Sequence, residues 1–299
     1  SRQISRLLAR VDANVKMRFR GKLVDIGCIQ HLTRVVATIA KLAKVCVCKI
    51  TADCVFFILS DAVAGGGAGV WCELQQNHFF SEYAMEGLAE DANEIFLEVS
   101  PDNIVRCLKS AHNAKSVKIK LTKKHSPCLT FEVDLPSMTN QSRLVVHDVP
   151  VTVVPRRMWE DFNEPEMPDF DVSLYMPPLK TVKNVVDKMK NLSNYVVLSA
   201  NRNGEMNLCT ETDLATVTTH FKGLQEPHWT AEENPNREER DVSEFAEARI
   251  DIRKLAQLLL GQQVNPLKVI CNIVHNKVAH LYLLQEDVSL QYFIPVVDT

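Results

Sequence analysis

The stretch PDNIVRCLKSAHNA, residues 101–114, carries the pattern of an amphipathic surface helix. Ile104 and Leu108 recur four residues apart and would share one face of that helix. Pro101 suits the first helical turn, and Ser100 before it suits the N-cap position. We therefore predict a helix over this stretch that buries one apolar face and exposes a polar one.

Three further segments share the helical period, namely residues 27–43, 178–193 and 252–263, with Asp251 as the expected N-cap of the last. The interval from start to start is 74 residues within each half of the chain, from 27 to 101 and from 178 to 252. The offset between the halves, from 27 to 178 and from 101 to 252, is 151 residues. The sequence between the helices alternates in the manner of short strands. This agreement predicts two copies of one unit of strands and two helices.

Composition divides the chain into four parts. Residues 1–16 are rich in Arg and could mimic a transit peptide, but we expect an extension outside the fold, before a start at Met17. Residues 155–170 combine prolines with acidic residues, which is typical of an exposed linker. The first domain is then expected over 17–154 and the second over 171–299.

The overall composition is that of a globular protein, with 46% hydrophobic and 24% charged residues. No run of 18 or more apolar residues occurs, so we expect no membrane-spanning segment. The nine cysteines are odd in number and lie mostly in apolar runs, which predicts buried free thiols in a reducing compartment. The net charge of -3 does not by itself suggest a nucleic-acid ligand.

The charge is nevertheless segregated along the chain. The four helices, taken as 26–44, 101–116, 178–192 and 250–263, hold 12 basic and 3 acidic residues, a net charge of +9. The rest of the chain holds the other 22 basic and 34 acidic residues, a net charge of −12. Basic helix faces neutralise phosphate backbones without reading sequence. Solvated lysines that only keep a protein soluble are the competing interpretation.

No catalytic motif accompanies these helices. GGGAG at 65–69 lacks the Lys-Ser/Thr of a phosphate-binding loop. The cysteines of 46–54 have neither a CxxC spacing nor a fourth ligand nearby, so buried thiols are favoured over a zinc site. His275 and His280 bracket a turn without an acidic–histidine motif. We therefore predict no catalytic residue, metal ligand or cofactor.

Several short motifs point to one family. They are MRFRGKLVD, IAKLAK, SVKIKLTKKHSPCLT, VVHDVPVTVVPRRMW, IDIRKL, GQQVNP and EDVSLQYFIP. From Met17 to about Val297 the chain resembles the hydroxyurea-sensitivity subunit of the nine-one-one DNA-damage checkpoint clamp, more strongly than it resembles the proliferating cell nuclear antigen. The resemblance implies an α+β DNA-clamp fold, in which two similar domains each place two helices on one face of curved antiparallel sheets.

The resemblance also implies a function. The chain would be a non-enzymatic subunit of a heterotrimeric ring that encircles DNA at damage sites in the nucleus, with a cytoplasmic pool before assembly. Its partners would be two other checkpoint clamp subunits, double-stranded DNA backbone, an ATP-driven clamp loader, repair enzymes and checkpoint mediators. Two alternatives stay open: a homotrimeric replicative processivity clamp, and a nuclease or transferase with an unrecognised site.

Residues can be assigned to these roles by matching the clamp pattern. Arg106 and Lys109 fall where clamps line their channel with basic residues, whereas Asp187 falls near a position where the replicative clamp carries a base. The complete DNA-facing set is expected to be Arg34, Lys41, Arg106, Lys109, Lys180, Lys183, Lys190 and Arg253. Subunits would pair through edge strands at 145–153 and 215–221. The residues expected there are Val145, Val146, Val149, Val151, Thr216, Val217, Thr218 and Thr219.

The closing stretch EDVSLQYFIPVV, residues 286–297, reads as a strand. Val288, Leu290, Tyr292 and Ile294 would bury one face. The resemblance implies that this strand pairs with residues 69–75. It also implies that Phe293 and Pro295, on the other face, help floor a pocket beneath the linker where partner peptides dock. The alternative is that Phe293 is only a packed core aromatic.

Overall fold

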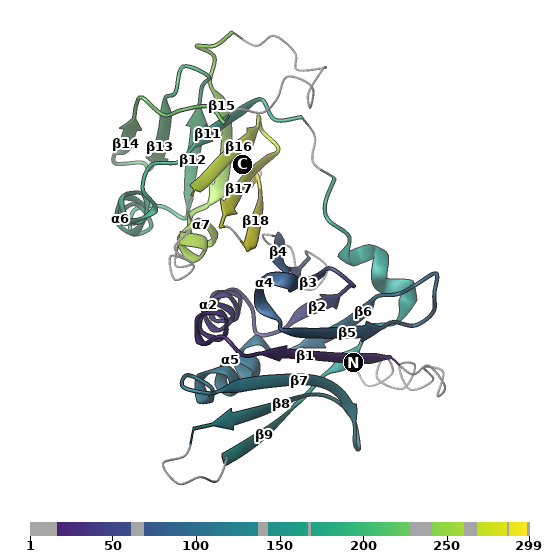
Figure 1. Ribbon diagram of the computed structural model, residues 1–299. Helices are drawn as coiled ribbons and strands as arrows, with labels where there is room; N and C mark the ends of the chain where they lie inside the picture. Colours follow the sequence, from purple (N-terminus) through teal and green to yellow (C-terminus); the bar gives the residue numbers. More distant parts are fainter. Residues whose placement is uncertain are drawn as a thin grey trace. The chain divides into compact units, whose positions relative to one another are not determined.

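The computed structural model of the protein describes seven stretches of the chain (Figure 1): residues 17–60, 69–136, 143–166, 169–227, 241–259, 268–285 and 287–297. The expected extension, residues 1–16, lies outside them, as does most of the glycine-rich stretch at 65–69. The described residues fall into two compact units. Unit 1 draws on 17–40, 44–58 and 74–163, and unit 2 on 41–43, 59–73 and 164–299.

Unit 1 contains a five-stranded antiparallel sheet in the order β5-β1-β7-β8-β9. Its strands are β1 (Arg18–Leu23), β5 (Glu82–Glu86), β7 (Ser116–Lys123), β8 (Pro127–Leu135) and β9 (Arg143–Pro150). Strict alternation makes one face apolar, where Phe19, Ile119 and Phe131 are buried. The opposite face carries charged side chains such as Arg20 and Lys120, which lie opposite each other in the register.

A second group of strands in unit 1 follows the order β10-β6-β2-β3. These are β2 (Cys46–Ile50), β3 (Cys54–Leu59), β6 (Ile95–Val99) and β10 (Thr152–Val153). The helices are α2 (Ile26–Leu42), the short α4 (Gln76–Phe79), α5 (Pro101–Ser110) and the 3-10 helix η1 (Arg156–Phe162). Figure 1 shows α2 and α5 on the same side of the unit. Leu32 of α2 and Ile104 of α5 line one apolar cavity of about 40 Å³ together with Ile50 and Phe131, so helices and strands share one core.

Unit 2 contains a four-stranded sheet in the order β14-β13-β12-β15. Its strands are β12 (Tyr195–Ala200), β13 (Met206–Glu211), β14 (Thr216–Phe221) and β15 (Ala246–Asp251). A second group runs β4-β18-β17-β16-β11, and all but the last two residues of β4 belong to unit 2. Those strands are β4 (Gly69–Gln75), β11 (Val172–Tyr175), β16 (Lys268–Val274), β17 (Val278–Leu284) and β18 (Val288–Pro295). The helices α6 (Leu179–Met189) and α7 (Ile252–Leu259) pack against each other.

The closing strand β18 is paired on both sides, with β17 and with β4. This confirms the predicted pairing with residues 69–75. The predicted inner face is also confirmed, because Val288, Leu290, Tyr292 and Ile294 are all buried. Backbone pairing on two sides and an apolar face therefore keep this strand ordered.

The ends of the helices follow from capping. Asp251 accepts hydrogen bonds at Oδ1 from the backbone N–H of Arg253 (2.8 Å) and Lys254 (3.3 Å), which confirms it as the N-cap of α7. Ser100 occupies the N-cap position of α5, although its side chain makes no capping bond. The prediction for α5 was too long, because Ala111 N donates to Leu108 O and closes the helix in a tight turn.

One strand boundary also differs from the prediction. The single strand expected through 145–153 is interrupted at Val151, whose N–H donates to Pro127 O (3.0 Å), and this splits it into β9 and β10. Strand β5 and helix α4 were not predicted. Within the described part of the chain, no helix has the length and apolar character needed to cross a membrane.

None of the nine cysteines forms a disulfide, and seven are buried, as the sequence predicted. Burial raises the pKa of the Cys48 and Cys271 thiols to about 12, so both remain protonated at neutral pH. Only Cys28, on α2, and Cys209, on β13, are partly exposed.

Candidate nucleic-acid interface and partner surfaces

The outer face of α5 carries exposed cations. The helix buries Ile104, Val105 and Leu108, which turns Arg106 and Lys109 to the solvent, where both are exposed. On α2, Arg34 and Lys41 are exposed seven residues apart, away from the buried stripe. The helical period thus placed these four side chains correctly on solvent-facing surfaces.

Many of the described basic residues outside α2, α5, α6 and α7 are paired with carboxylates. Those with an ion pair are Arg18, Arg20, Lys22, Lys49, Lys120, Lys124, Arg156, Arg202 and Lys222. Of the eight expected DNA-facing residues, only Lys183 and Lys190 form an ion pair with a residue that the structure describes. The charge of the remaining six is available to a ligand. They are Arg34, Lys41, Arg106, Lys109, Lys180 and Arg253.

Asp187 offsets much of the charge of α6. Its carboxylate accepts a short hydrogen bond from Lys183 Nζ and another from Lys190 Nζ at 2.7 Å. These bonds, that of Lys183 above all, hold the pKa of Asp187 below its ordinary value. The carboxylate is therefore charged throughout the neutral range. The spacing of three and four residues is typical of ion pairs along one helix face, so the sequence contained this signal although our prediction did not use it.

Both strands expected at the subunit interface lie at the edge of a sheet. Among the described strands, β9 pairs only with β8, and β14 only with β13. Val146 on β9 and Val217 on β14 expose 49% and 38% of their surface, which suits a contact with another chain. The structure adds Leu144, 60% exposed, which the sequence analysis missed.

The other expected interface residues differ in how far their side chains are buried. Thr216 and Thr218 are exposed, and Val145 and Thr219 are half-buried. Val149 and Val151 are buried inside unit 1, so only their backbone could take part in pairing.

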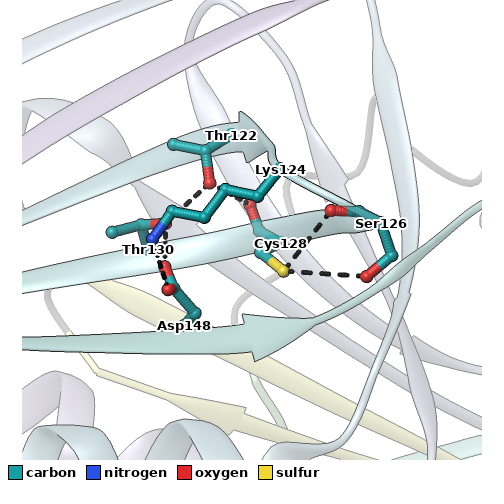
Figure 2. A network of polar contacts seen from close by, with 6 residues as sticks. All are labelled: Thr122, Lys124, Ser126, Cys128, Thr130 and Asp148. Atoms are coloured by element: carbon teal, nitrogen blue, oxygen red, sulfur yellow. Dashed lines mark hydrogen bonds and ion pairs between the residues drawn. The ribbon is translucent and has the colours of Figure 1, made fainter.

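A polar network holds the edge strand β9 in place (Figure 2). Asp148 accepts at Oδ2 from Lys124 Nζ and at Oδ1 from Thr130 Oγ1, both at 2.6 Å. A carboxylate can only accept, so Thr130 donates its hydroxyl proton there and accepts from Thr122 Oγ1 at 2.7 Å. Lys124 and then Thr130 hold the pKa of Asp148 below its ordinary value. These bonds link β9 to β8 and β7 on the face that has no apolar core.

The outer face of β18 bears the two expected pocket residues. Pro295 is exposed, whereas Phe293 is 8% exposed and stacks on His280 with ring centroids 4.8 Å apart. A side chain at Gly69 of the neighbouring β4 would come within 3.6 Å of the Phe293 ring. His280 also stacks on Phe170, which comes from the expected linker.

A chain of hydrogen bonds runs from the same linker into the sheet. Gln291 Nε2 donates to Glu164 Oε1 (2.6 Å), which leaves Gln291 Oε1 to face His280 Nε2 (3.0 Å). Burial lowers the pKa of His280 to about 4, so its ring is neutral at pH 7. The proton then sits on Nε2, and Nδ1 accepts from Asn272 Nδ2 (2.9 Å). Sequence reasoning found none of these partners, because they come together only through the register of three strands.

A family model described as Hus1-like protein matches residues 17–298. The chain belongs to the Hus1 family. It is 55% identical to checkpoint protein HUS1 of Homo sapiens over 279 residues, which cover 93% of this chain and 99% of that protein. It is 29% identical to checkpoint protein Hus1-like of Drosophila melanogaster, covering 94% of this chain and 99% of the relative. It is also 29% identical to checkpoint protein hus1 of Schizosaccharomyces pombe, with coverage of 85% and 88%.

Among solved structures, this Hus1-family chain resembles the proliferating cell nuclear antigen of Entamoeba histolytica with a TM-score of 0.68. The match covers 94% of this chain and 99% of that one at 10% sequence identity. The predicted α+β DNA-clamp fold is thereby confirmed. At this identity the likeness concerns the fold alone.

Proposed function

We propose that this Hus1-family chain is one subunit of a heterotrimeric checkpoint clamp that encircles double-stranded DNA. The observation that carries the DNA contact is that six of the eight expected DNA-facing cations, all of them on helices, form no ion pair with a described residue. Contacts from Arg and Lys to phosphates fix position without reading bases, so binding is expected to be independent of DNA sequence. The clamp fold and the family membership support assembly with other clamp subunits.

We also propose how the ring is placed and what it does on DNA. The ring would be placed at damage sites by an ATP-driven clamp loader and would act in the nucleus as a non-enzymatic scaffold. It would hold repair enzymes and checkpoint mediators on DNA and so support kinase signalling. The unpaired edges of β9 and β14 are the surfaces proposed for contact with the two other subunits.

Self-association tests the heterotrimer directly. In size-exclusion chromatography with light scattering, the chain alone is expected to give no stable trimer. Mixed with the two other clamp subunits, it is expected to give a complex with one copy of each, because its two edges would then meet complementary strands. A stable homotrimer of this chain alone would contradict the proposal.

We further propose that Phe293 and Pro295 contribute to a docking surface for partner peptides. Phe293→Ala is expected to weaken the binding of repair enzymes while ring assembly persists, because the substitution removes a large ring from the outer face of β18. Pull-down of repair enzymes on assembled rings measures the effect.

Phe293→Leu is the matched control, since it keeps apolar volume on His280 but loses the ring stack. The thermal unfolding temperature shows whether each variant is folded. Unchanged enzyme binding by a folded Phe293→Ala ring would assign Phe293 to the core only.

A further inference from the structure

The two faces of the sheet β18-β17-β16 are unlike each other. Along one cross-strand row, Cys271, Leu281 and Tyr292 form an apolar face. The neighbouring row, on the other face, places Asn272 and His280 beside Phe293. Asn272 and His280 are 1% and 4% exposed.

Buried polar groups cost free energy unless they are hydrogen-bonded. The Oδ1 atom of Asn272 is buried and has no partner among the described residues. The polar groups of this face would therefore tolerate being uncovered by a side chain that leaves.

Two side chains of the linker lie on this face. The Phe170 ring is parallel to His280, with an interplanar angle of 3° and centroids 5.5 Å apart. The Glu164 carboxylate accepts from Gln291, which the neutral His280 holds in the donating orientation. An aromatic ring and a carboxylate are therefore what this face binds within its own chain.

The Phe170 side chain can leave the His280 ring without breaking the backbone pairing of β11, the strand that follows it. Directly after it, Asp171 donates its N–H to Ile273 O (3.0 Å) and accepts at Oδ2 from His275 N (2.6 Å). The main chain is fixed at this point, so rotation of the Phe170 side chain is sufficient to remove its stack on His280. Phe170 is only half-buried, which is consistent with a low barrier to that rotation.

We propose that Phe170 and Glu164 are built-in occupants of a peptide-docking position, and that a partner peptide with one aromatic ring and one carboxylate replaces them on His280 and Gln291. The inference rests on the proposed role of the Phe293 face and adds its regulation. We call the binding of Phe170 and Glu164 to this position self-occupancy. The apparent affinity for any partner is then the intrinsic affinity multiplied by the fraction of molecules in which the position is open. Weak partners are thereby excluded unless avidity or high local concentration assists them.

The test uses the chain's own segment as the probe. A fluorescent synthetic peptide of residues 162–172, FNEPEMPDFDV, carries both occupants. Its anisotropy is measured against the full chain in three forms: unsubstituted, Phe170→Ala, and Glu164→Ala with Phe170→Ala. The peptide is expected to bind the double variant roughly three- to tenfold more tightly than the unsubstituted chain, the range of one aromatic stack. A peptide with Ala in place of Phe170 is expected to lose this gain.

A second readout follows the His280 ring directly. Neighbouring aromatic rings shift its proton resonances, so Phe170→Ala is expected to move them and the added peptide to move them back. Phe170→Leu keeps apolar bulk and is expected to show an intermediate affinity, which guards against misfolding of the Ala variant. The proposal would be overturned if the peptide bound the variants and the unsubstituted chain with equal affinity. It would also be overturned if neither the substitution nor the added peptide changed the His280 resonances.

The tests of self-occupancy and of the proposed docking function can succeed or fail independently. The peptide measurement involves no repair enzyme, so self-occupancy can hold even if Phe293→Ala leaves enzyme binding unchanged. Conversely, Phe293→Ala could abolish enzyme binding while the peptide affinities of all chain forms are equal. That result would support the docking surface and rule out Phe170 and Glu164 as its internal occupants.

Discussion

Replacing Thr218 with proline is expected to release one neighbouring subunit from the ring. Thr218 lies in the edge strand β14, which has β13 on one side and no described strand on the other. The Thr212 N–H donates to Ala215 O at the turn between β13 and β14, so the alternation of an antiparallel ladder directs the Val217 N–H toward β13 and the Thr218 N–H outward. A neighbour that adds a strand there needs the outward N–H groups of β14, and the substitution removes one of them and stiffens the backbone. Because edge strands tolerate proline, unit 2 should remain folded while the ladder between subunits is broken.

Val217→Pro is the matched control, because N–H groups along an edge strand point alternately toward and away from the sheet. Thr218→Pro removes an outward N–H and should block assembly with little change in unfolding temperature. Val217→Pro removes the N–H that faces Thr210 of β13 and should destabilise unit 2. Light scattering of the mixed subunits measures assembly. Normal assembly of a one-to-one-to-one complex with Thr218→Pro would refute the assignment of β14 as an interface strand.

The double substitution Arg106→Ala with Lys109→Ala is expected to weaken DNA binding by the assembled ring equally on all DNA sequences. Each phosphate contact contributes about 0.9 to the slope of log affinity against log salt, so the slope should fall by up to about 1.8. At about 0.1 M salt this amounts to a loss of roughly ten- to hundredfold. Fluorescence titrations at several salt concentrations, on duplexes of unrelated sequence, give both quantities.

Two control variants sharpen this experiment. Arg20→Ala with Lys22→Ala removes the same charge from the strand β1, where both residues pair with Glu82, and should leave the slope unchanged. Asp187→Asn should act in the opposite direction, because it frees Lys183 and Lys190 and steepens the slope by up to about 1.8. A slope that does not change in the Arg106 and Lys109 double variant would remove α5 from the DNA interface.

The sequence predicted the four long helices and their repeat because each helix buries one apolar stripe. The residues of such a stripe lie three or four apart in the sequence, so the pattern is visible without knowledge of the fold. The exposure of Arg106 and Lys109 followed from the same period. Strand β5 was missed because it is an edge strand whose alternate residues are only half-buried, so its pattern is weak.

The contacts of the site depend on register between strands, which the sequence does not display. Asp148 meets Lys124 and Thr130 only because β7, β8 and β9 align in one register. His280 meets Gln291 and Asn272 for the same reason on β16, β17 and β18. Asp187 was the exception, since its two partners lie within one helical turn and could have been predicted.

The distribution of thiols offers a practical route to following this clamp at work. Seven cysteines are shielded by burial, and the two partly exposed ones fall in different units, Cys28 in unit 1 and Cys209 in unit 2. A thiol-reactive donor and acceptor dye would therefore attach selectively at one position in each half of the unmodified chain. Energy transfer between them would report changes in the separation of the halves when the other subunits or DNA are added, without any engineered cysteine.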